Sequence, residues 1–80
     1  MEDLSFILDE IVAGNYRTTR HAHLRMSERN ISEADIVECA LSGQIKSIDR
    51  KFIINGFDID GEKLRIICTY KYDVLLITVI

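Results

Sequence analysis

The amino-acid sequence predicts an α+β fold in which two or three N-terminal helices pack on one face of an antiparallel sheet of three or four strands. Two observations support this class. Apolar residues recur at helical spacing in the first half, whereas the second half is rich in the strand formers Ile, Val, Tyr and Thr. No proline, repeat or linker divides the 80 residues, so a single domain, 1–80, is expected.

Three helices are predicted in the first half of the chain. Thr18 or Thr19 supplies an N-cap for the second helix, since a threonine hydroxyl can accept a hydrogen bond from a free backbone N–H. Ser32, followed three residues later by Asp35, resembles a capping box at the start of the third helix, and Gly43 ends that helix. The expected ranges are about 3–13, 19–29 and 33–42.

The second half predicts an antiparallel meander. Asp60-Gly61 is a favourable hairpin turn, and Tyr72-Asp73 lies where a second turn is required. Asn55-Gly56 is interpreted as a β-bulge, because a hairpin there would leave too short a returning strand. The last segment, VLLITVI, is apolar on both faces and should be a central or covered strand. The expected strands are 52–54, 64–70 and 74–80, with 44–49 as a weaker fourth strand.

The charges are unevenly distributed along a chain whose net charge is −3. Residues 2–10 carry four acidic residues and no cation, whereas residues 15–30 carry four arginines against Glu28 alone. A basic stripe of this kind can bind a polyanion even on an acidic protein. It can equally pair with the acidic first helix, and charge alone leaves both explanations open.

Several classes of function find no support in the sequence. No apolar run approaches the roughly 20 residues of a membrane helix, and the acidic start is unlike an export signal. We therefore expect a cytoplasmic protein without a membrane partner. Cys39 and Cys68 lack the spacing of a metal site and are predicted to be reduced, buried thiols. No metal or cofactor is expected.

The second helix concentrates its cations on one stripe. At about 100° per residue, His21, Arg25 and Arg29 follow one another along a slanting line on the helix surface. This line lies inside an arc bounded by Leu24 and Met26, which are apolar. Arginines that serve only for solvation belong on the opposite arc, so the stripe is predicted to be partly buried.

Two explanations of this stripe remain open. In the structural one, Arg25 or Arg29 pairs with an acid such as Asp49 and ties the helix to the sheet. In the functional one, the stripe lines a cleft that receives phosphate, where His21 exchanges a proton and the arginines stabilise phosphoryl charge. The second explanation predicts that His21 is less exposed than His23.

Three segments carry a family resemblance: "TRHAHLRMSERNISEADIVECALSGQI", "IDRKFIINGF" and "LLITVI". In order and spacing they are similar to the domain of unknown function numbered 4258, over residues 16–79. The resemblance implies a small fold akin to the RelE-like and BrnT-like ribonuclease toxins, with a small antitoxin-like protein as partner. Ile80 stands where many members have a tyrosine. The histidine, arginines, acidic-basic pair, strand glycine and terminal threonine of the family pattern fall at His21, Arg25, Arg29, Asp49-Arg50, Gly56 and Thr78.

The leading functional prediction is a toxin-type, metal-independent endoribonuclease, or a degenerate relative, in which the ribose 2′-OH attacks the adjacent phosphate. The alternative is a non-catalytic module that binds protein or RNA. RNA and the antitoxin-like protein are the expected partners, and DNA is not. The predicted catalytic residues are His21, Arg25 and Arg29, and the predicted substrate-binding residues are Arg50, Lys51 and Tyr70.

Overall fold

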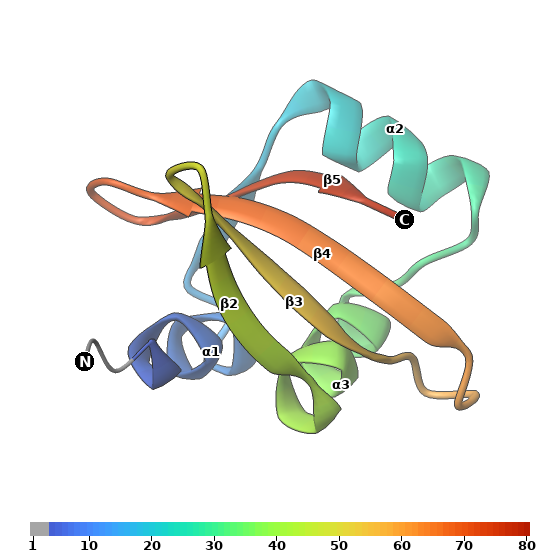
Figure 1. Ribbon diagram of the computed structural model, residues 1–80. Helices are drawn as coiled ribbons and strands as arrows, with labels where there is room; N and C mark the ends of the chain where they lie inside the picture. The colour runs from blue at the N-terminus through green and yellow to red at the C-terminus, as the bar shows by residue number, and fades with distance from the viewer. Residues whose placement is uncertain (1–3) are drawn as a thin grey trace.

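The computed structural model describes residues 4–80 and confirms the α+β class (Figure 1). The helices are α1 (Ser5–Val12), α2 (Arg20–Glu28) and α3 (Glu33–Ser42). The strands are β1 (Tyr16–Thr18), β2 (Gln44–Ile48), β3 (Lys51–Phe57), β4 (Lys63–Tyr70) and β5 (Val74–Val79). All three predicted helices are present close to their expected ends. Of the described helices, none is long and apolar enough to cross a membrane.

The sheet has five strands in the order β1-β5-β4-β3-β2 and is mixed, whereas a purely antiparallel sheet of three or four strands was expected. The difference is β1, which pairs in parallel with β5, with Tyr16 opposite Val74. A strand of three residues carries too little alternation to be recognised from sequence. Both predicted turns are confirmed, since Asp60-Gly61 joins β3 to β4 and Tyr72-Asp73 joins β4 to β5. The prediction that β5 is central is also confirmed, because β5 lies between β1 and β4.

The short β1 is held by side chains near both of its ends. Arg17 donates from Nε and Nη2 to the two carboxylate oxygens of Asp73, at 2.6 and 3.0 Å. Beyond the other end, the Thr19 hydroxyl donates to the carbonyl oxygen of Ile77 on β5 and accepts from the backbone N–H of Ala22. Thr19 is therefore the N-cap of α2, as predicted, and it also fixes this helix against β5.

The predicted capping box at the start of α3 is confirmed and has a further contact. Asp35 accepts from the backbone N–H of Ser32 at 2.8 Å, and the Ser32 hydroxyl accepts from the backbone N–H of Asp35 at 3.2 Å. The second carboxylate oxygen of Asp35 accepts from the backbone N–H of Ile59, in the loop between β3 and β4. These backbone donors lower the pKa of the Asp35 carboxyl below its ordinary value. One buried carboxylate thus fixes the start of α3 and the β3–β4 loop together.

The prediction of a β-bulge at Asn55-Gly56 is wrong. Strand β3 pairs with β4 without interruption through both residues. The glycine serves a close approach instead, because a Cβ at Gly56 would collide with the carbonyl oxygen of Cys39 in α3. The irregularity of the sheet lies between β4 and β5, where the register shifts between Ile67 and Cys68.

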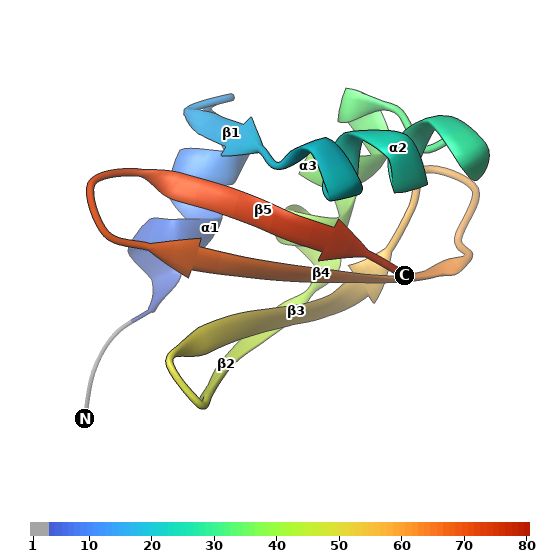
Figure 2. The ribbon, with the colours of Figure 1, turned by 90° about the horizontal axis from the view of Figure 1, so that it is seen from above.

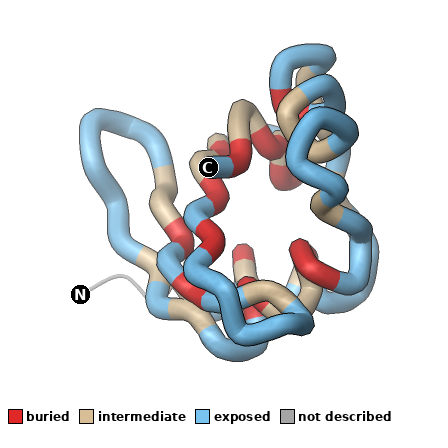
Figure 3. The backbone as a smooth tube through the Cα atoms, turned by 90° about the vertical axis from the view of Figure 1, so that its right-hand side faces the viewer, coloured by how far each residue is buried: buried red, intermediate tan, exposed pale blue. Residues whose placement is uncertain are grey.

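The helices lie on one side of the curved sheet, and no described element covers its other side (Figures 1 and 2). Buried segments of the strands and helices face the space between them (Figure 3). The buried apolar residues are Ile7, Ile11, Ala22, Ile36, Cys39, Ala40, Ile54, Leu64, Ile66, Cys68, Val74, Leu76 and Val79.

We call the uncovered side of the sheet the open face. Because side chains alternate along a strand, those paired on this side of β2–β5 are Gln44, Lys46, Ile48, Lys51, Ile53, Asn55, Phe57, Lys63, Arg65, Ile67, Thr69, Leu75, Thr78 and Ile80.

Gly56→Ala is expected to destabilise the protein by about 1–3 kcal/mol, because α3 must move away from β3 to admit the new methyl group. For a domain of this size each kcal/mol corresponds to a fall in Tm of about 4–8 °C, measurable by circular dichroism. Ser47→Ala, at an exposed position of β2, is the matched control and should change Tm little. An unchanged Tm for Gly56→Ala would show that α3 does not approach β3 as closely as described.

Asp35→Asn is expected to lower the free energy of unfolding by about 1–2 kcal/mol near neutral pH. The amide has only one acceptor oxygen, so it cannot accept from the backbone N–H groups of both Ser32 and Ile59 as the carboxylate does. The folded-state pKa of Asp35 is lowered, so its stabilisation is present above the ordinary pKa near 4 and is lost as the pH falls through the folded value. Urea denaturation of both proteins should therefore give a difference that shrinks from pH 6 towards pH 3. A constant difference over this range would contradict the assigned role of the carboxylate.

Candidate nucleic-acid interface

The strands place cations on the open face through simple alternation. In β4 the sequence KLRI buries Leu64 and Ile66 and turns Lys63 and Arg65 outward. Pairing then sets Lys63 opposite Phe57, and Arg65 opposite Asn55 on β3. Two further exposed lysines, Lys46 of β2 and Lys51 of β3, complete the set of cations on this face.

The open face contains no acidic strand side chain, although the protein as a whole has 13 acidic residues against 10 basic ones. Within residues 4–80, the only ion pair joins Arg17 to Asp73, at the β4–β5 turn. The four cations of the open face therefore have no described carboxylate partner. Uncompensated cations gathered on one surface attract a polyanion.

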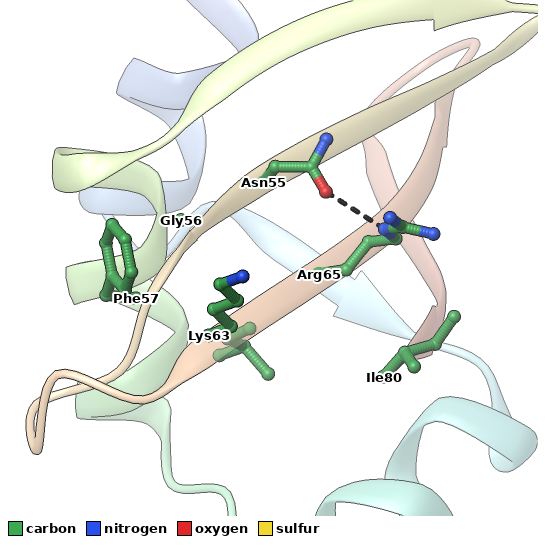
Figure 4. A pocket seen from close by; sticks show the side chains of 7 residues that line it. Asn55, Gly56, Phe57, Lys63, Arg65 and Ile80 are labelled. Carbon is green, nitrogen blue, oxygen red and sulfur yellow. Dashed lines mark hydrogen bonds between the residues drawn. The ribbon is translucent and has the colours of Figure 1, made fainter.

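One end of the open face is hollowed into a pocket of about 510 Å³ (Figure 4). Arg65 is one of the residues that line it, and its Nε donates to the side-chain oxygen of Asn55 at 2.9 Å. This neutral amide orients the guanidinium group without cancelling its charge, and the other guanidinium nitrogens extend beyond it (Figure 4). The pocket is lined by Asn55, Gly56, Phe57, Lys63, Leu64, Arg65 and Ile80.

Apolar side chains lie among these cations. Phe57 and Ile80 at the pocket are 45% exposed each. Ile53, Ile67 and Leu75, further along the strands, are half-buried, although no described helix covers them. The face therefore offers a ring and aliphatic surfaces beside fixed positive charge. This combination suits unpaired nucleic-acid bases, whose flat faces stack on apolar groups while their phosphates meet the cations.

Of the predicted catalytic stripe, His21 and Arg29 are exposed and only Arg25 is half-buried. Helix α2 packs on β5 and β1 through Ala22, which is buried, and Met26, which is half-buried. Leu24 is 49% exposed on the opposite side of the helix, so it does not bound a buried arc. The buried side is thus rotated away from the predicted one. In consequence His21 is exposed, as is His23.

The ion pair that the structural explanation of the stripe requires is not found within residues 4–80. Arg25 is half-buried and Arg29 is exposed. Within the described part of the chain, no ion pair or side-chain hydrogen bond links either arginine to Asp49, which lies in the β2–β3 turn. The suggestion that they tie α2 to the sheet is therefore wrong. The side-chain tie between α2 and the sheet is made instead by its N-cap Thr19, whose hydroxyl donates to the carbonyl oxygen of Ile77 on β5.

The predicted substrate-binding residues fall into two places. Lys51 lies on the open face, and Arg50 precedes it at the tip of the β2–β3 hairpin. Arg50 has φ 67° and its neighbour Asp49 has φ 49°, so both occupy the left-handed region that a two-residue hairpin turn requires. For a residue other than glycine this conformation costs about 1 kcal/mol. Tyr70 is elsewhere, since its ring packs edge-on against Phe6 of α1 at 5.1 Å between centroids.

The two cysteines are buried and unpaired, as predicted. Burial raises the pKa of the Cys39 thiol to about 11 and that of the Cys68 thiol to about 12. Both thiols are therefore protonated at neutral pH and unsuited to nucleophilic chemistry. No group of side chains within residues 4–80 could hold a metal ion.

Sequence reasoning missed Asn55, Lys63 and Arg65 as site residues, although a signal for them exists. In the segment 63–66 the two cations alternate with two aliphatic residues, which in a half-buried strand sends both cations to the same face. The contribution of Asn55 depends on cross-strand register, which the sequence did not fix.

Comparison with known families assigns the chain. A family model described as a domain of unknown function (DUF4258) matches residues 18–80. The chain belongs to this family. The match to DUF4258 contains α2, α3, β2–β5 and every residue of the open face, whereas α1 precedes it. Neither the curated proteins nor the solved structures gave a match to the chain.

Proposed function

We propose that this protein binds single-stranded RNA on its open face, with one phosphate held by Arg65 and Lys63. The observation that carries the proposal is the pairing of Arg65 with the neutral Asn55, on a face without acidic strand side chains. A guanidinium group held by a carboxylate would already be neutralised. Held by an amide, it keeps its charge and its remaining N–H donors for a phosphate.

A single strand fits this face better than a duplex does. A duplex buries its bases and presents mainly phosphates, so it would leave Phe57 and Ile53 without a partner. An unpaired base can stack on the ring of Phe57, which stands opposite Lys63 across the strand pair. The protein carries a net charge of −3, so the attraction is local to this face and should be weakened by salt.

Cleavage of RNA is the second candidate, and the family resemblance is its main support. A metal-independent reaction needs an acid and a base near the reacting phosphate. The pocket lining, given above, includes neither a histidine nor a side-chain carboxylate, and His21 lies exposed on α2. The geometry therefore favours binding over catalysis. The predicted small antitoxin-like partner also stays a prediction.

Arg65→Gln is expected to weaken binding of a fluorescein-labelled oligouridylate about tenfold, because one charge-assisted phosphate contact is removed. In fluorescence anisotropy, the slope of log K against log salt concentration should become about 0.7 less negative. Arg20→Gln changes the net charge equally on α2, away from this face, and should leave both quantities near the wild-type values. Equal weakening by both variants would show that only net charge matters.

Asn55→Asp should have the same effect as Arg65→Gln, since the new carboxylate would pair with Arg65 and neutralise it. Its Tm should not fall, which separates loss of binding from loss of fold. A wild-type protein that binds no single-stranded RNA even at low salt would refute the proposed function. Preference for a matched DNA strand would reassign the ligand.

Cleavage is tested by incubating RNA with the folded protein in EDTA. If the enzyme prediction holds, RNA is cut, and His21→Ala or Arg25→Ala lowers the rate by about a hundred-fold or more. His23→Ala, on the same helix and also exposed, is the control and should retain the wild-type rate. Intact RNA after binding has been demonstrated would leave a binding module and dismiss the enzyme.

A further inference from the structure

We infer that the bound RNA strand extends from the pocket to one side only, along β3 and β4 to the tip of the β2–β3 hairpin. One end of the strand therefore lies at the pocket. This inference rests on the proposed function and adds to it the number of bound nucleotides and the position of one end of the RNA strand. It follows from the charges at the two ends of the open face, which have opposite signs.

At the pocket end, the face is bounded by an acidic loop. Residues 58–62 join β3 to β4 and contain three acidic residues and no cation. The loop is fixed in place, because Asp58 accepts from the backbone N–H groups of Asp60 and Glu62, each at 2.9 Å. The backbone of Ile59 is fixed in turn to Asp35 of α3. A strand of phosphates that passed beyond the pocket would meet these carboxylates and be repelled.

At the other end, the hairpin tip carries two cations and one acidic residue, Asp49, so its net charge is positive. Lys51 begins β3 on the open face, and Arg50 lies next to it at the hairpin tip. Arg50 adopts φ 67°, where glycine would be less strained. Lys46, opposite Ile53, lies between this tip and the pocket. Phosphates leaving the pocket in this direction therefore meet positive charge at the middle and at the end of their path.

The length of the path sets the size of the site. Phe57 at the pocket and Lys51 at the hairpin are six positions apart on β3, which corresponds to about 20 Å. A stacked single strand rises about 3.4 Å per nucleotide, so about six nucleotides span this distance. An extended strand needs fewer. We therefore expect a site of about three to six nucleotides.

A series of labelled oligouridylates of two to twelve nucleotides tests this inference by anisotropy at low salt. After correction for the number of binding registers, the affinity of the wild-type protein should increase up to about six nucleotides and then level off. Arg50→Gly should bind the dinucleotide as the wild type does and lose several-fold affinity for the hexanucleotide. Its Tm should rise, because glycine relieves the left-handed backbone, so a folding defect cannot explain the loss.

The opposite end is tested by Asp60→Asn combined with Glu62→Gln. Removing two of the three loop charges should allow longer strands to gain affinity beyond six nucleotides. The inference is overturned if the wild-type affinity is the same for all lengths, if it continues to rise to twelve nucleotides, or if Arg50→Gly weakens the dinucleotide as much as the hexanucleotide. Each of these results still requires bound RNA. Absence of binding at every length would refute the proposed function instead.

Discussion

The close approach of α3 to β3 decides how the rest of the molecule is arranged. Gly43 and Gly56 both face the carbonyl oxygen of Cys39, at the C-terminal end of that helix. Side chains at either position would hold the helix away from the sheet and open the core between them. The close contact between α3 and β3 builds the core on one side of the sheet. The outward residues of β3 lie on the open face, which no described helix covers.

Charge then separates the two sides of the protein. Eleven of the 13 acidic residues lie within residues 4–80, all in helices, turns and loops, and none is a strand residue of the open face. An acidic protein can therefore present a positive surface without a positive net charge. Solubility depends on the net charge of the protein, whereas binding of a charged ligand depends on the charge of the surface that it meets. Membership of DUF4258 assigns this arrangement to a family but not to an activity, so the case for RNA depends on the geometry of Arg65 and Asn55.

Much of the fold was predictable because its signals are local. Thr19 starts α2, and Ser32 with Asp35 starts α3, through contacts within a few residues, and those contacts are present. The errors all involve distant partners. Strand β1 exists because β5 pairs with it, and Gly56 is required because α3 passes over it. Neither partner can be read from the residues nearby.

The candidate site was harder to predict for the same reason. The helical wheel of α2 places residues relative to one another, but it does not say which side meets the sheet. The sequence predicts Leu24 and Met26 at the edges of the buried arc, but only Met26 packs, together with Ala22, whereas Leu24 is exposed. A small alanine allows a helix to lie close to a strand, whereas hydropathy alone favours the larger leucine. Arg50 and Lys51 were proposed from the charge pattern and the family resemblance, and the structure adds that they lie at a hairpin tip. Arg65 was missed because its partner Asn55 lies on another strand.

The parallel pairing of β1 with β5 has a consequence for the order of folding. Tyr16 meets Val74, 58 positions later in the chain. By contrast, β2, β3 and β4 are joined by short turns, and α3 leads directly into β2. Contacts between residues close in sequence form sooner, because closing a short loop loses less conformational entropy. A nascent chain leaving the ribosome can therefore assemble the α3–β4 unit early, with α1 packed on α3, while β1 and α2 must wait for β5 to be synthesised. Until then the buried side of α2 faces solvent, and the chain depends on the speed of that last step to avoid aggregation.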